Sequence, residues 1–322
     1  MLRRLIALSF GATLALALQA QQETVIRVNV ELVRVLATVK NSAGDMVGSL
    51  AREDFEILDN GVPQQIAVFE RHTEQPLSVA LLVDTSGSTG KELKYELESV
   101  SRFLKALFGS GNPEDAVALY SFNWQITKHN SFTHNQGSIE RSMKTFRAEA
   151  GTALYDAIYL ASADVERREG RRVMIVVTDG GDTTSVKGFH QALEAAQMAD
   201  AVIYPVLIIP ITNPAGRNTG GENALSNMAA ATGGRVFAPT VGPALDAAFA
   251  EIIKDLRTQY LLGFYPKAVP PTANRFHRIE VRVRRPDLRV SARNGYYGDA
   301  EGDSGPPGGR IPVSPQDRKQ EK

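Results

Sequence analysis

Hydrophobic runs of strand length recur through the middle of the chain and alternate with segments of helical periodicity. The run LSVALLVD, residues 77–84, is almost continuously apolar, as expected for a strand that is covered on both faces. Similar runs return as DAVALYSF, RRVMIVVTD, AVIYPVLII and RVFAP. Apolar residues at helical spacing lie around residues 93–107, 136–146, 153–168, 187–199, 222–232 and 243–257. This alternation predicts an α/β domain over residues 76–257, with a doubly wound and mostly parallel sheet.

The segments on either side of this domain have the pattern of antiparallel strands. Residues 24–75 mix β-branched with polar residues, and their DNG sequence at 59–61 is a strong signal for a hairpin turn. In residues 258–298, the stretch FHRIEVRVRR alternates apolar with charged residues, which is typical of a strand with one buried face. Neither flank is large enough to fold alone. We therefore expect the two flanks to pair into one small β domain.

Both ends of the chain predict segments outside the folded domains. Residues 1–20 contain two arginines, an apolar stretch at 5–18 and small residues before a cleavage point after Ala20, the pattern of a secretory signal peptide. A membrane anchor is the alternative, but the stretch is shorter than the roughly 20 residues that span a bilayer. We expect a secreted or periplasmic protein without stable membrane insertion after cleavage. Residues 299–322, rich in Gly, Pro and charge, predict a disordered tail.

Composition narrows the possible partners and chemistry. Lysine plus arginine (36) balance aspartate plus glutamate (36), so no overall field favours a nucleic acid or an anionic membrane. With no cysteine, the protein has neither disulfides nor thiolate metal sites. Arginines near the C-terminus alternate with apolar residues, which favours a solvated sheet face over a binding stripe; they are Arg278, Arg282, Arg284, Arg285, Arg289 and Arg293.

Oxygen-bearing side chains follow the ends of several predicted strands. Asp84 ends one apolar run and precedes Ser86 and Ser88, Asp179 ends another, and Thr152 lies in a loop before a helix. In an open α/β sheet, ligands bind beyond the carboxyl ends of the strands, where such loops converge. Two carboxylates and three hydroxyls suit a hard cation, Mg²⁺ or Mn²⁺, rather than Zn²⁺. Because Mg²⁺ releases water reluctantly, we expect the hydroxyls to bind it directly and one or both aspartates to act through water.

The order of these residues, Asp84-x-Ser86-x-Ser88, then Thr152, then Asp179, resembles the von Willebrand factor type A (VWFA) domain family and its metal-ion-dependent adhesion site. The resemblance covers residues 76–257, and the layout with a signal peptide is similar to bacterial secreted VWFA-related proteins. It implies a Rossmann-like fold and divalent-cation-dependent protein binding or adhesion rather than catalysis. The expected partner is a protein that offers an acidic side chain to the metal.

Alternative functions for the same residues explain less of the sequence pattern. Asp84 and the serines can cap the following helix, but capping accounts for neither Thr152 nor Asp179. The sequence lacks the glycine and hydroxyl pattern of a phosphate-binding loop and the second acid of an aspartyl phosphatase. A metal-dependent hydrolase needs a general base, for which only Asp182 and Glu149 lie nearby in the sequence. A structural envelope component with a stabilising metal is the remaining alternative. Packing is the expectation for Trp124, the single tryptophan.

Overall fold

The structure, a computed structural model, describes residues 32–71, 75–90, 92–109, 111–208, 218–270, 272 and 274–298. The signal peptide expected at residues 1–20 and the tail expected at 299–322 lie outside these ranges. Within the described ranges, no helix combines the length and apolar character that crossing a bilayer requires.

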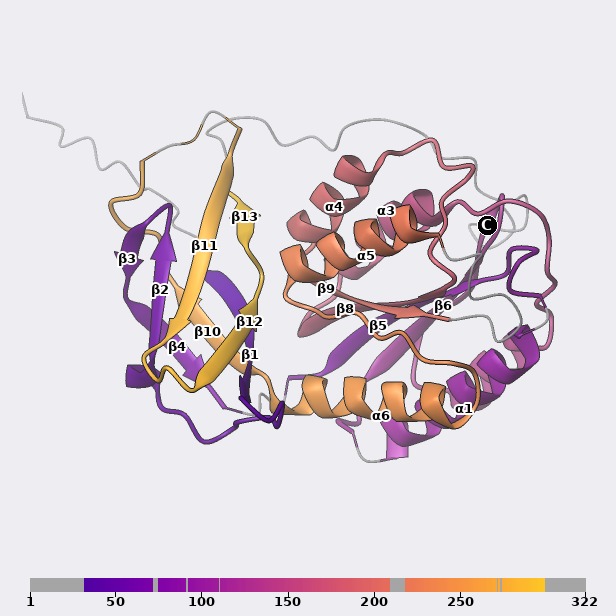
Figure 1. Cartoon of the computed structure of the whole chain (residues 1–322), viewed down its shortest axis with the longest axis horizontal. Helices are drawn as coiled ribbons and strands as arrows, with labels where there is room; N and C mark the ends of the chain where they lie inside the picture. Colours follow the sequence, from indigo (N-terminus) through magenta and orange to yellow (C-terminus); the bar gives the residue numbers. More distant parts are fainter. Residues whose placement is uncertain are drawn as a thin grey trace, which may run out of the picture. The chain divides into compact units, whose positions relative to one another are not determined.

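A five-stranded sheet forms the centre of the α/β domain (Figure 1). In spatial order its strands are β7 (Ile126–Thr133), β6 (Ala116–Phe122), β5 (Leu77–Asp84), β8 (Arg171–Thr178) and β9 (Ala201–Leu207). The last four run parallel, whereas β7 pairs antiparallel with β6. Every residue of β5, β6 and β9 is buried, which explains their continuous apolar sequences. The four parallel strands were therefore predicted correctly.

Two parts of this region differ from the prediction. The run RVFAP forms only an isolated bridge, between Phe237 and Val206, and not a strand. Strand β7 has no counterpart among the predicted strands. Its residues are mostly half-exposed, because it lies at the edge of the sheet, so its sequence carries no apolar run.

Helices cover both faces of the sheet. They are α1 (Leu93–Gly109), α2 (Gln136–Met143), α3 (Leu154–Glu166), α4 (Phe189–Met198), α5 (Thr219–Thr232) and α6 (Pro243–Thr258). On one face α1 lies against α6, where the rings of Phe103 and Phe249 are 5.0 Å apart between centroids. The other face carries α3, α4 and α5 over a second apolar cluster that includes Leu82 and Ile158 (Figure 1). The predicted fold class, a doubly wound and mostly parallel α/β domain with additional antiparallel sheets, is confirmed.

Strands from the two flanks of the α/β domain pair with one another in two antiparallel sheets. One sheet has the order β12 (Leu288–Ala292), β1 (Val33–Asn41), β10 (Tyr260–Phe264) and β4 (Ile66–Glu70). The other has the order β13 (Gly295–Tyr297), β11 (Phe276–Val283), β2 (Phe55–Asp59) and β3 (Val62–Gln64), and the 3₁₀ helix η1 (Arg52–Asp54) precedes β2. Their apolar core includes Val35, Ile57 and Tyr260. Each flank thus supplies pairing partners that the other needs.

The sequence predicted the turn at residues 59–61 correctly, but it did not predict the burial of Arg293. Asn60 and Gly61 both have positive φ, 47° and 82°, in the turn between β2 and β3, as expected for a DNG hairpin. Among the arginines expected on a solvated face, five are exposed, but Arg293 is buried. Arg293 turns inward because its guanidinium forms an ion pair with Asp200.

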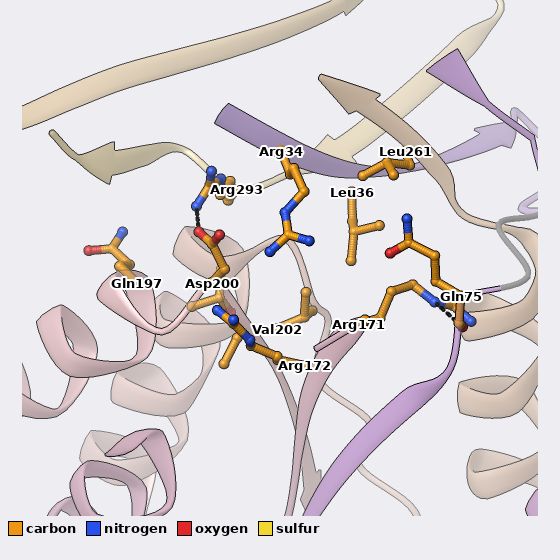
Figure 2. Close-up of a pocket in the computed structure, with 13 residues that line it drawn as sticks. Arg34, Leu36, Gln75, Arg171, Arg172, Gln197, Asp200, Val202, Leu261 and Arg293 are labelled. Atoms are coloured by element: carbon orange, nitrogen blue, oxygen red, sulfur yellow. Dashed lines mark hydrogen bonds and ion pairs between the residues drawn. The ribbon is translucent and has the colours of Figure 1, made fainter. Parts of the chain in front are cut away.

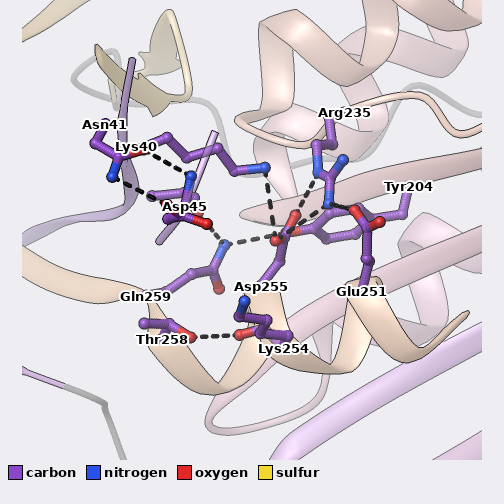
Figure 3. Close-up of polar contacts among 11 residues, drawn as sticks. Lys40, Asn41, Asp45, Tyr204, Arg235, Glu251, Lys254, Asp255, Thr258 and Gln259 are labelled. Atoms are coloured by element: carbon purple, nitrogen blue, oxygen red, sulfur yellow. Dashed lines mark hydrogen bonds and ion pairs between the residues drawn. The ribbon is translucent and has the colours of Figure 1, made fainter. Parts of the chain in front are cut away.

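A polar network joins the end of α6 to β1 (Figure 3). The Asp255 carboxylate, 2% exposed, accepts hydrogen bonds from Arg235 Nε at 2.6 Å and Nη2 at 3.3 Å. Lys40 of β1 approaches the same carboxylate to 3.9 Å. Nearby, Gln259 donates to the Tyr204 hydroxyl at 3.2 Å. Two cations therefore compensate one buried carboxylate at this junction.

Candidate functional site

The predicted site lies where neighbouring parallel strands β5 and β8 end. Asp84 is the last residue of β5, and Asp179 directly follows Thr178, the last residue of β8. The register of the two strands pairs Val83 with Val177, so both strands end at the same level. Adjacent parallel strands of equal extent bring their carboxyl ends to one edge, which is why sequence position alone could identify the pair.

The loop after β5 holds two serine hydroxyls together. The Ser86 amide donates to Asp84 Oδ1 at 2.7 Å, and the hydroxyls of Ser86 and Ser88 lie 3.0 Å apart. Thr89 stabilises the loop, since its hydroxyl donates to the backbone carbonyl oxygens of Asp84 at 3.1 Å and Ser86 at 3.0 Å. The alternate spacing of the serines thus brings the two hydroxyls together, and Ser86 lies beside the Asp84 carboxylate.

Asp84 is a buried acid, with 0% of its surface exposed. Its second oxygen, Oδ2, accepts a hydrogen bond from the Thr178 hydroxyl at 2.6 Å. Burial raises the pKa of Asp84 from 3.8 to about 6, although hydrogen bonds from Thr178 and Ser86 oppose the rise. The neighbouring charge of Asp179 raises this pKa further. Two carboxylates that repel one another in a poorly hydrated place form an environment that favours a cation.

Thr152 lies in a loop that is bonded to the loops after both strands. At its start, the Glu149 amide donates to the Thr85 carbonyl oxygen at 3.0 Å, and Glu149 forms a parallel bridge with Ser86. At its end, the Thr152 amide donates to the Thr183 hydroxyl at 2.9 Å, and the Thr183 amide donates to the Thr152 carbonyl oxygen at 2.9 Å. The structure therefore brings the Thr152 loop to the edge that carries Asp84.

Gly151 is required by the close packing of this loop. Its φ is +82°, and a Cβ at this position would lie 2.9 Å from Trp124 Cβ and 3.1 Å from Thr184 Cγ2. A side chain would strain the backbone and displace its neighbours. The glycine thus fixes where the adjacent Thr152 lies.

The donor set fits a hard divalent cation. In the part of the chain that the structure describes, no group of three or more His, Cys, Asp or Glu side chains could hold a metal. The expected set contains only two acids, Asp84 and Asp179, and takes its remaining oxygens from the hydroxyls of Ser86, Ser88 and Thr152. Hydroxyl and carboxylate oxygens are ligands that Mg²⁺ and Mn²⁺ prefer. Cation binding by these residues stays a prediction.

Sequence reasoning missed Glu96, a buried acid close to this edge. Glu96 lies in the first turn of α1 with 0% of its surface exposed, and neither carboxyl oxygen has a hydrogen-bond partner among the described residues. Burial raises its pKa well above the ordinary value, and the charges of Asp84 and then Glu92 and Asp179 raise it further. The available signal was its spacing, three residues after Leu93 and four before Val100, on the apolar face of the helix.

Comparison with protein families identifies the domain that carries this site. Residues 79–181 match the family model of the von Willebrand factor type A domain. The chain contains a von Willebrand factor type A domain. The matched residues include the segments that contain Asp84, Thr152 and Asp179. A comparison with curated proteins found no match.

Several solved structures of VWFA domains and pilus proteins are similar to this chain. The vWF domain of the type V pili tip protein Mfa5 from Porphyromonas gingivalis is 14% identical, with a TM-score of 0.45, over 56% of this chain and 94% of that one. The conserved hypothetical protein BatB from Bacteroides thetaiotaomicron is 20% identical, with a TM-score of 0.43, over 56% and 100%. The pilus adhesin SpaC from Lactobacillus rhamnosus GG is 10% identical, with a TM-score of 0.48, over 75% and 47%.

Proposed function

We propose that this VWFA domain binds Mg²⁺ or Mn²⁺ and uses the cation to recognise an acidic side chain of a protein partner outside the cytoplasm. VWFA domains commonly mediate protein–protein interaction or adhesion, which is the general role that the family match supports. The observation that carries the metal proposal is the buried Asp84 carboxylate beside paired serine hydroxyls and the charge of Asp179. The extracytoplasmic location depends on the sequence pattern of residues 1–20.

In this proposal the hydroxyls of Ser86, Ser88 and Thr152 would hold the cation, with Asp84 and Asp179 acting directly or through water. Both Asp84 oxygens already accept hydrogen bonds, at 2.7 and 2.6 Å, which favours an indirect role for this residue. When bound, the cation would supply an electrophilic centre that attracts a carboxylate. The carboxylates of Asp84 and Asp179 balance the two positive charges of the cation. In this proposal a remaining coordination position then takes a carboxylate from the partner.

An exposed aromatic side chain beside the loops supports a protein partner. Trp124, where packing was expected, is 58% exposed. Its indole donates to Glu149 Oε2 at 2.9 Å, and its Cβ lies against Gly151, next to Thr152. Tryptophan is enriched among the residues that dominate protein interfaces. We propose that Trp124 contacts the same partner that reaches the cation.

The two acids that the sequence offers as general bases for a metal-dependent hydrolase, Asp182 and Glu149, are both hydrogen-bonded to neighbouring loops. Asp182 Oδ2 accepts hydrogen bonds from the Tyr155 amide at 3.0 Å and the Ser185 hydroxyl at 2.5 Å. Glu149 is bonded to Trp124. Both candidate bases are thus engaged in holding loops, so the geometry supports the binding function better than catalysis.

Calorimetric titration of Mg²⁺ and Mn²⁺ into wild type and Asp84→Ala tests the metal proposal. We expect the substitution to abolish binding while the domain stays folded, as judged by circular dichroism. Asp84→Asn keeps a side chain of the same size and serves if the alanine variant unfolds. Glu98→Ala, which removes an exposed acid from α1, is the matched control and should bind like wild type. Equal cation affinity in wild type and both Asp84 variants would end the proposal.

A cross-linked pull-down from the native envelope tests the partner. Capture should depend on the cation, so a chelator should remove the partner while an equal concentration of a non-chelating salt should not. Trp124→Ala should weaken capture and leave Mg²⁺ affinity unchanged. A partner that is retained equally with chelator contradicts cation-mediated recognition.

A further inference from the structure

A cavity lies between the amino ends of β8 and β9 and the strands β1 and β10 (Figure 2), and both arginine and apolar side chains line it. Its volume is about 40 Å³, which corresponds to room for roughly three water molecules. Four arginines line it together with a single acid, Asp200: they are Arg34, Arg171, Arg172 and Arg293. Arg171 and Arg172 begin β8, whereas the predicted metal site lies at the other end of the same strand. At about 3.3 Å per residue, roughly 20 Å separate the two places.

The positive charges in this cavity are incompletely balanced. Asp200 is paired with Arg293, and backbone carbonyl oxygens of Arg168 and Ala199 accept hydrogen bonds from Arg172 at 2.8 and 2.9 Å. Burial lowers the pKa of Arg172, the charge of Asp200 raises it, the like charge of Arg34 lowers it, and the charge of Glu166 raises it again. Figure 2 shows the Arg34 guanidinium extending from β1 into the space above Arg172. An anion bound between Arg34 and Arg172 would reduce the repulsion of these like charges.

Two guanidinium nitrogens in the cavity wall have no hydrogen-bond partner in the described structure. They are Arg293 Nε and Arg171 Nη2, and their residues are only 9% and 3% exposed. Because burial of an unmet donor is unfavourable, an acceptor bound close to these side chains would stabilise them. Burial also lowers the pKa of Arg171 to about 10, with the like charge of Arg257 as the next contribution.

We propose that this cavity is a binding site for one small oxyanion, of the size of phosphate or sulfate. Arginine forks bind such oxygens with paired, charge-assisted hydrogen bonds. Arg34 from β1, Arg172 from β8 and Arg293 from the link between β12 and β13 would share the anion. The volume excludes a nucleotide. A bound anion connects the antiparallel strands to the α/β domain and stabilises that junction, independently of the metal site.

Thermal unfolding in phosphate, sulfate, acetate and chloride at matched ionic strength tests this site. At ten times the dissociation constant, phosphate should raise the wild-type melting temperature by roughly 3 °C relative to chloride. Sulfate should act alike and acetate less, if the site selects tetrahedral oxyanions. Titration calorimetry with phosphate should give one site per chain.

Variants separate specific binding from a general salt effect. Arg34→Gln and Arg172→Gln should lose the phosphate-induced rise, while in chloride Arg34→Gln should melt at the wild-type temperature or above, because a like charge is removed. Arg289→Gln, which changes an exposed arginine of β12, should keep the full response. The proposal is overturned if phosphate acts no better than chloride on wild type, or if the Arg34 and Arg172 variants respond as wild type does.

Discussion

Replacing Glu96 by leucine should stabilise the protein when no divalent cation is present. Both carboxyl oxygens of Glu96 are buried without a partner in the described structure. An unmet buried polar group costs about 1–3 kcal/mol, and leucine would instead pack beside Leu93 and Val100 on the inner face of α1. We expect the free energy of unfolding to rise by about 2 kcal/mol in Glu96→Leu.

The pH dependence gives this prediction a second readout. Burial and neighbouring charges raise the folded-state pKa of Glu96, so above pH 4.5 the folded protein keeps a proton that the unfolded chain has released. Stability contributed by this group is therefore complete below pH 4.5 and falls as the pH rises toward the folded-state pKa. Leucine removes that loss. The advantage of Glu96→Leu over wild type should grow from pH 4.5 toward pH 8.

Urea unfolding in the presence of a chelator, followed by circular dichroism at several pH values, measures both effects. Glu98→Leu is the control, since Glu98 is exposed on the same helix and its replacement should change stability by less than about 0.5 kcal/mol. The reasoning is refuted if Glu96→Leu is less stable than wild type at pH 7.5 in chelator, or if its advantage does not depend on pH.

Three further predictions concern the junction, the site loop and the antiparallel sheets. Asp255→Ala leaves Arg235 without its buried partner and should lower the free energy of unfolding in urea by about 3 kcal/mol; Asp246→Ala, from an exposed ion pair, should cost less than about 1 kcal/mol. Gly151→Ala should reduce Mg²⁺ affinity in calorimetry and lower stability by about 1–2 kcal/mol, whereas Gly44→Ala, also at positive φ but with open space around it, should lower stability and leave affinity unchanged. Deleting residues 259–298 removes the partners of β1 and β2, so amide exchange in these strands should accelerate; full retention of their protection contradicts the pairing.

The sequence predicted the parallel strands and the helices α1–α6 because their physical cause is local. A strand covered on both faces must be apolar throughout, and β5, β6 and β9 are buried at every residue. The sequence did not predict strand β7, because an edge strand with half-exposed residues needs no apolar run. Phe237 forms only a bridge to the edge strand β9 and not a strand, so apolar character alone did not predict the extent of pairing.

The candidate site also contains some features that the sequence predicts and others that depend on tertiary packing. Asp84, Ser86, Ser88 and Asp179 could be chosen from sequence, because strand ends and alternate spacing are visible there. The hydrogen bond from Thr178 to Asp84 depends on the pairing of β5 with β8, and the burial of Glu96 depends on how α1 packs in the core. No local sequence pattern states either arrangement. The arginine cavity combines β1, β8 and the β12–β13 link, so it exists only once distant segments meet.

Opposite charges at the two ends of β8 give the two proposed sites a common physical basis. At the carboxyl end, burial raises the pKa of Asp84 from 3.8 to about 6, so its ionisation at neutral pH costs about 3 kcal/mol in the absence of a cation. Saturation by a ligand at 100 times its dissociation constant returns about 2.7 kcal/mol, which offsets most of that cost. At the amino end, the like charge of Arg34 lowers the pKa of Arg172, although the charges of Asp200 and Glu166 oppose this effect. If both proposals hold, each end of β8 would be stabilised by an ion of opposite sign, and the two ions would act independently.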